Sequence, residues 1–120
     1  MDFLYTSSDF LFPTIRSVLE PRGKWVPMGD PNHVLMAGLD GDATACMLIE
    51  QGLVDATGVQ NLFYEAELTM NRLLQAVEEG DTQPNEVLLD PGFALTAGNF
   101  IWQSDDMWGC KLYREGFLDQ

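Results

Sequence analysis

Three times along the chain, an apolar strand-like segment is followed by a short polar cluster and then by a segment with helical spacing. The apolar segments lie at residues 3–6, 34–39 and 56–59, and helices are predicted over 13–19, 43–51 and 62–79. Strands that alternate with helices imply right-handed crossovers between parallel strands. We therefore predict an α/β fold of βαβ units with a mostly parallel sheet, to which a fourth apolar segment at 87–96 adds.

Polar side chains occupy each transition from predicted strand to predicted helix. They are Ser7, Ser8, Asp9, Asp40, Asp42, Gln60 and Asn61. In open α/β sheets, ligands bind outside the carboxyl ends of the strands. A carboxylate accepts hydrogen bonds from neighbouring hydroxyls, and a primary amide both donates and accepts, so Asp9, Asp40 and Gln60 would suit a neutral polyol. Serine, aspartate and asparagine before a helix are also ordinary N-caps, and for any one of these residues taken singly capping is the favoured role.

The chain is strongly acidic, with 19 acidic and 6 basic side chains and a formal net charge of −13. Such a surface repels nucleic-acid phosphates and anionic membranes, so neither is expected as a partner. The first residues lack the basic start and apolar stretch of a secretory signal, and no apolar run approaches the ~18 residues of a membrane span. We expect either a cytoplasmic protein or a mature or truncated piece of an exported one.

The two cysteines lie in different settings. Cys46 falls in an apolar helical stretch, and Cys110 falls in a polar tail. Two cysteines of this kind do not decide the redox compartment of the protein. From their settings we predict a buried thiol and a free thiol rather than a disulfide.

Four segments together are similar to those of a known family. They are Tyr5-Thr6-Ser7-Ser8-Asp9, Ala37-Gly38-Leu39-Asp40-Gly41, Asp55-Ala56-Thr57-Gly58-Val59-Gln60 and Asp90-Pro91-Gly92-Phe93-Ala94-Leu95-Thr96. This series resembles the last part of the type I periplasmic sugar-binding proteins of ABC transporters, the group that includes ribose-binding proteins. The resemblance implies a type I periplasmic-binding-protein-like fold, present here only as the last third of a two-lobed protein.

The resemblance also implies roles for individual residues. Asp40 matches the sugar-binding aspartate of the family and Gln60 its amide ligand at the lobe crossover, while Ser8 replaces an asparagine and Asp9 lies beside it. The implied function is non-catalytic capture of a sugar or polyol by hinge closure, with delivery to a membrane permease. The implied location is the periplasm, and no cofactor, metal or enzymatic activity is expected.

The predicted domain organisation follows from the same resemblance. Residues 1–99 would form the carboxy-terminal part of the domain, within which 61–86 would belong to the other lobe, and 100–120 would form a tail. The helix over 62–79 carries one apolar stripe, at Phe63, Ala66, Met70, Leu73, Leu74 and Val77. Because this stripe needs a partner, we expect the helix either to fold back on its own sheet or to form a homodimer through Leu62–Glu79.

Two other functions fit parts of the sequence. The effector-binding domain of a LacI-type transcription regulator would share the fold. A haloacid-dehalogenase-like phosphatase would use Asp40 as nucleophile and Asp42 as acid/base, but it needs a lysine between this motif and Asp105, and none is present. An EF-hand calcium site at Asp40-Gly41-Asp42 is excluded because Ala45 occupies the position that requires glycine. Trp102 and Trp108 could offer a face to a sugar, although interior packing or an interface is expected for them.

Overall fold

The computed structural model describes residues 2–80 and 87–119. It confirms the α/β fold with a mostly parallel sheet. The strands are β1 (Phe3–Tyr5), β2 (Leu35–Asp40), β3 (Ala56–Val59) and β4 (Phe93–Thr96), and they lie in the order β1-β2-β3-β4. The first three strands are parallel, and β4 runs antiparallel to β3. The carboxyl ends of β1, β2 and β3 therefore share one edge of the sheet.

Helices follow the strands much as predicted. They are η1 (Asp9–Leu11), α1 (Phe12–Leu19), η2 (Glu20–Arg22), α2 (Ala43–Glu50), α3 (Leu62–Glu79), α4 (Phe100–Gln103), η3 (Ser104–Asp106), α5 (Trp108–Arg114) and η4 (Phe117–Asp119). Pro13 lies in the first turn of α1, where its missing N–H is not needed. Gly80 caps α3 as expected. Among the described residues, no helix is long and apolar enough to span a membrane.

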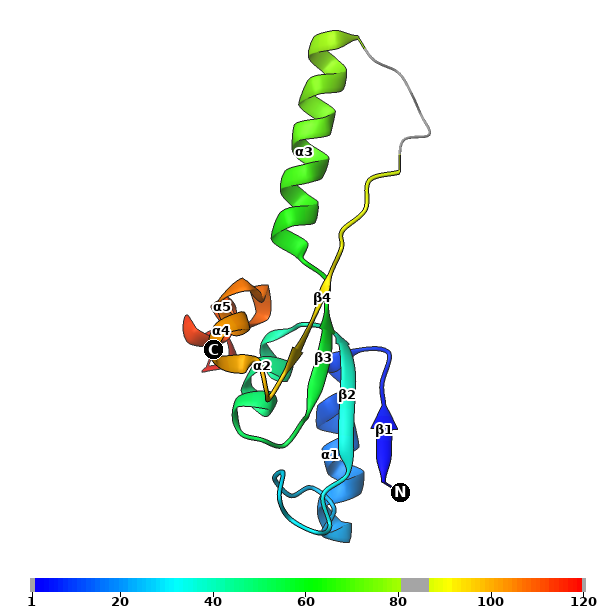
Figure 1. Ribbon diagram of the computed structural model, residues 1–120, viewed down its shortest axis with the longest axis vertical. Coiled ribbons are helices and arrows are strands. Elements are labelled where there is room, and N and C mark those ends of the chain that lie inside the picture. The colour runs from blue at the N-terminus through cyan, green and yellow to red at the C-terminus, as the bar shows by residue number, and fades with distance from the viewer. Residues whose placement is uncertain (1, 81–86, 120) are drawn as a thin grey trace.

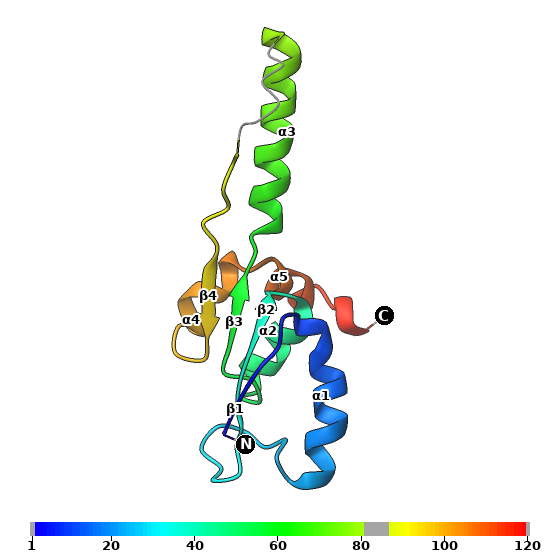
Figure 2. The same ribbon diagram turned by 90° about the vertical axis from the view of Figure 1, so that its right-hand side faces the viewer.

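The hydrophobic core lies between the sheet and the helices α1, α2 and α5. Its buried side chains include Phe12, Val34, Met36, Ala45, Cys46, Ile49, Val54, Leu95, Met107 and Cys110. Figure 2 shows α1 along one side of the sheet, with α2 and α5 further up the same body. We refer to the sheet together with α1, α2, α4 and α5 as the sheet body.

The prediction of two unpaired thiols is wrong. Cys46 on α2 and Cys110 on α5 form a disulfide, and both side chains are fully buried. The misleading signal was the polar composition around Cys110. That segment forms an amphipathic helix, and Cys110 lies on the side of α5 that packs against α2.

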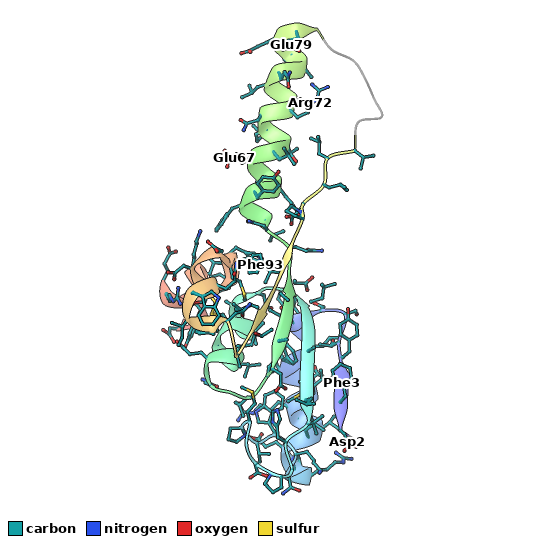
Figure 3. All side chains as sticks on the ribbon, viewed as in Figure 1. Asp2, Phe3, Glu67, Arg72, Glu79 and Phe93 are labelled. Carbon is teal, nitrogen blue, oxygen red and sulfur yellow. A yellow bond between two sulfur atoms is a disulfide. The ribbon has the colours of Figure 1, made fainter. Side chains whose placement is uncertain are left out.

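Helix α3 projects from the sheet body, which gives the molecule extents of 60 × 28 × 26 Å (Figure 1). None of its described residues is buried. Figure 3 shows Glu67, Arg72 and Glu79 along the projecting helix, beyond Phe93 at the start of β4. The helix does not fold back on its own sheet. Residues 81–86 of the predicted 61–86 segment lie outside the described residues.

Candidate functional site

Ser8 and Asp40 meet at the carboxyl edge of the sheet, although they are far apart in the sequence. The Ser8 hydroxyl donates a hydrogen bond of 2.7 Å to Oδ2 of Asp40. Both residues are half-buried. Within residues 2–80 and 87–119, no donor binds the other carboxylate oxygen of Asp40. One oxygen of this carboxylate is therefore held by the protein, and the other is available to a ligand.

Gln60 lies next to Asp40, at the point where the chain leaves β3 for α3. Its backbone N–H donates to the carbonyl oxygen of Asp40 at 3.2 Å, and its side chain is exposed. The neighbouring Asn61 is an N-cap, since its Oδ1 accepts from the N–H of Tyr64 at 3.2 Å. The structure thus brings Ser8, Asp40 and Gln60 to one edge, and capping accounts for Asn61.

Asp9 does not face solvent at this edge. Its side chain is fully buried, and its carboxylate accepts bonds from the N–H groups of Gly41 and Asp42 and from the hydroxyl of Thr57. Burial raises the pKa of Asp9 to about 7, because desolvation outweighs these hydrogen bonds. The sequence pattern located Asp9 correctly at the transition from strand to helix, but it held no signal for Thr57.

Asp42 is the N-cap of α2. Its Oδ1 accepts from the N–H of Ala45 at 2.7 Å, and the side chain is buried. Burial also raises the pKa of Asp42. Asp105 in η3 pairs with Arg114 in α5. Asp42, the acid/base of the phosphatase alternative, therefore acts as a helix cap, and Asp105, the first residue of an acidic pair that could imitate the late metal-binding pair of such a phosphatase, has an arginine partner.

The tail segment contributes Trp108 to the same edge. The indole N–H of Trp108 donates to the carbonyl oxygen of Asp40 at 3.2 Å. The next residue, Gly109, lies so close to the β2–α2 turn that a Cβ there would come within 2.2 Å of the backbone carbon of Asp42. Trp102, by contrast, is 68% exposed on α4. Trp108 is therefore half-buried at the site and packs against the core, and Trp102 is largely exposed.

Asp90 joins the two segments that connect the sheet body to α3. Its Oδ2 accepts from the N–H of Asn61 at 2.7 Å, and its Oδ1 accepts from the N–H of Gly92 at 3.0 Å. These bonds, led by the one from Asn61, lower the pKa of Asp90. The outgoing and returning crossovers are thereby held side by side.

A groove of about 450 Å³ lies beside this edge, between the first turns of α3 and the helices α4 and α5. Its lining residues are Asn61, Phe63, Tyr64, Glu67, Phe93, Gln103, Asp106 and Lys111. The ammonium group of Lys111 lies 5.3 Å from the centroid of the Phe63 ring. Ser8, Asp40 and Gln60 do not line this groove.

Comparison with known proteins gives matches in structure only. No protein-family profile and no curated protein matches the sequence. A galactofuranose-binding protein has a TM-score of 0.70 and 13% identity over 96% of this chain. The periplasmic binding protein component of the arabinose ABC transporter from Shewanella sp. ANA-3, solved with α- and β-L-arabinofuranose, has a TM-score of 0.70 and 13% identity over 99% of this chain.

These neighbours establish the fold. The chain spans 35% of the length of each of them. The predicted resemblance to periplasmic sugar-binding proteins is confirmed at the level of structure, and the chain has part of the periplasmic-binding-protein fold.

Proposed function

We propose that this chain supplies one side of a sugar-binding cleft in the solute-binding component of an ABC-type importer. The observation that carries the proposal is the pair formed by Ser8 and Asp40, at the carboxyl ends of two parallel strands. Ligands of open α/β sheets bind at this edge. One solved neighbour of the same fold is a galactofuranose-binding protein, and another is the periplasmic binding protein component of an arabinose ABC transporter.

The chemistry of the edge suits a neutral polyol. The free oxygen of Asp40 can accept from one or two adjacent sugar hydroxyls, and bonds to a charged acceptor are the stronger kind. The exposed amide of Gln60 can both donate and accept. An anionic ligand would instead meet the repulsion of a chain with a net charge of −13.

In the proposed mechanism the protein binds without reacting. A second lobe closes over the edge, and the closed form is presented to a membrane permease. The two crossovers tied by Asp90 form part of the hinge. The buried disulfide supports an oxidising compartment such as the periplasm, and it favours an exported protein over a cytoplasmic transcription regulator.

The projecting helix fits the same proposal. Residues 61–86 would belong to the other lobe, and the exposed apolar side chains of α3 would pack against its remaining elements. A homodimer through Leu62–Glu79 is the competing arrangement. Sedimentation of the isolated chain separates the two, because a monomer at tens of micromolar would exclude the homodimer.

A calorimetric titration with furanoses, pyranoses and polyols tests the sugar proposal. The samples are this chain and the longest natural polypeptide that contains it. We expect saturable binding by the longer form, weakened about 10- to 100-fold in Asp40→Ala, because hydrogen bonds to a charged group contribute about 1.5–3 kcal/mol. Asp30→Ala, in an exposed loop, is the matched control. A folded longer form that binds none of these furanoses, pyranoses and polyols would contradict the proposal.

A further inference from the structure

The backbone of Asp40 is strained. Its φ is +114°, a value that L-residues other than glycine rarely adopt. Such a conformation costs free energy and persists only where the surrounding structure enforces it. Asp40, which is proposed to bind the ligand, is thus held in this conformation by neighbouring residues, and the structure identifies them.

Asp9 binds the turn between β2 and α2, which contains the residues after Asp40. Its Oδ2 accepts from the N–H of Gly41 at 2.8 Å and from the N–H of Asp42 at 3.3 Å, the two residues that follow Asp40. The hydroxyl of Thr57 on β3 completes the set, at 2.8 Å from Oδ2 and 3.0 Å from Oδ1. One buried carboxyl therefore connects η1, the β2–α2 turn and β3.

The sheet makes room for this carboxyl. A Cβ added to Gly38 on β2 would lie 2.0 Å from Oδ1 of Asp9. Only glycine at this position leaves room for the carboxyl group of Asp9. The space and the three donors together make a site built around the carboxyl of Asp9.

Trp108 binds the same turn through the carbonyl group of Asp40. Its indole N–H binds the carbonyl oxygen of Asp40, and α5 is fixed to α2 by the Cys46–Cys110 disulfide. The carbonyl oxygen of Asp40 also accepts a hydrogen bond from the backbone N–H of Gln60. The carbonyl oxygen of Asp40 therefore has two donors, which fix the orientation of its peptide group.

We propose that Asp9 and Trp108 are positioning residues, which do not touch the sugar but hold the strained Asp40 in the conformation that binds it. The proposal rests on the function proposed above. It gives Asp9 a different role from direct ligand contact, and it makes the tail segment part of the binding apparatus. Preorganisation of this kind strengthens binding because the ligand does not have to order the turn.

Asparagine should substitute for Asp9. Its amide oxygen can take the place of Oδ2 and accept from Gly41 and Asp42, while its NH₂ group takes the place of Oδ1 and donates to the hydroxyl of Thr57. Alanine can do neither. The burial that raises the pKa of Asp9 to about 7 agrees with this, since the protonated acid can form the same pattern.

The test compares Asp9→Ala, Asp9→Asn, Trp108→Phe and Val54→Ala in the longest natural polypeptide that contains this chain. Val54 is fully buried just before β3, at the opposite edge of the sheet, so Val54→Ala controls for a loss of core stability. We expect sugar affinity to fall at least tenfold in Asp9→Ala and about threefold in Trp108→Phe. It should stay within threefold in Asp9→Asn and within twofold in Val54→Ala.

Hydrogen exchange of the Gly41 amide gives a readout that needs no ligand. We expect this amide to exchange at least tenfold faster in Asp9→Ala than in Val54→Ala, and near the unmutated rate in Asp9→Asn.

If the unmutated protein binds no sugar, the proposed function fails, and faster Gly41 exchange in Asp9→Ala still supports the positioning role. If Asp9→Ala does not fold, Asp9→Asn and Trp108→Phe decide, because a Trp108→Phe variant with unchanged affinity and unchanged Gly41 exchange overturns the role. Equal effects of Asp9→Ala and Val54→Ala overturn it as well.

Discussion

The sheet body and α3 differ in how their apolar side chains are covered. In the sheet body, Phe12, Met36 and Leu95 are fully buried, whereas Leu73 and Leu74 on α3 are each 55% exposed. Both regions show clear apolar patterning in the sequence. The comparison teaches that periodicity identifies the face of an element that should be buried, but it does not say which part of the structure buries it.

The largest expected difference is in amide hydrogen exchange. A single helix without tertiary partners is marginally stable in water, so the amides of α3 should open by local unfolding. We expect them to exchange at least about 100-fold faster than the amides of β2, measured residue by residue on this chain. Equal protection of the two regions at low protein concentration would contradict the conclusion that α3 lacks tertiary partners. Protection of α3 that increases with protein concentration would indicate that a second copy of the chain packs on it.

Removing the disulfide should affect only the sheet body. Cys46 and Cys110 are separated by 64 positions, and loss of a cross-link of that span costs about 4 kcal/mol of unfolding free energy in the chain-entropy description. The double variant Cys46→Ala with Cys110→Ala should therefore unfold at much lower urea concentration, while the exchange rates of α3 stay the same. An unchanged urea midpoint would mean that the bond adds little to the packing of α5 on α2.

Matched truncations in the two regions should differ in size. Met36→Ala removes a fully buried side chain and should cost about 3 kcal/mol of unfolding free energy. Leu74→Ala removes a side chain that is half exposed and should change it by less than about 0.5 kcal/mol. Urea unfolding measures both. A large cost for Leu74→Ala would show that α3 has a partner in solution.

The smallest effect concerns the ionisation of Asp9. Its pKa is raised to about 7 in the folded protein, above the value of about 4 for an unfolded chain. A raised acid pKa gives stability that is present at low pH and is lost as pH rises through the folded value. Between about pH 6 and about pH 8, the unfolding free energy should fall by about 1 kcal/mol more in the unmutated chain than in Asp9→Asn. Parallel pH profiles would contradict the raised pKa.

Much of the sheet body could be predicted from sequence, because its signals are local. The alternation of apolar segments, polar clusters and helical spacing located β1, β2 and β3 and the helices α1 and α2, and outside the sheet body it located α3. The same alternation placed Ser8, Asp40 and Gln60 at one sheet edge. Their contact with a sugar stays a prediction.

The contacts made across the fold could not be predicted. The pairing of Cys46 with Cys110 depends on α5 returning to α2, which no local pattern specifies. The same return brings Trp108 to Asp40. Asp9 and Thr57 are 48 positions apart, and only the twist and register of the sheet bring the hydroxyl to the carboxyl.

The disulfide also has a topological consequence. It closes a covalent ring from Cys46 to Cys110, and all of α3 with both crossovers lies inside that ring. A protease that cuts the backbone within α3 would leave two fragments still joined through sulfur, the first holding β1, β2 and β3 and the second holding β4 of the same sheet. The projecting part of the chain can thus be opened, or given new termini, without the sheet body coming apart.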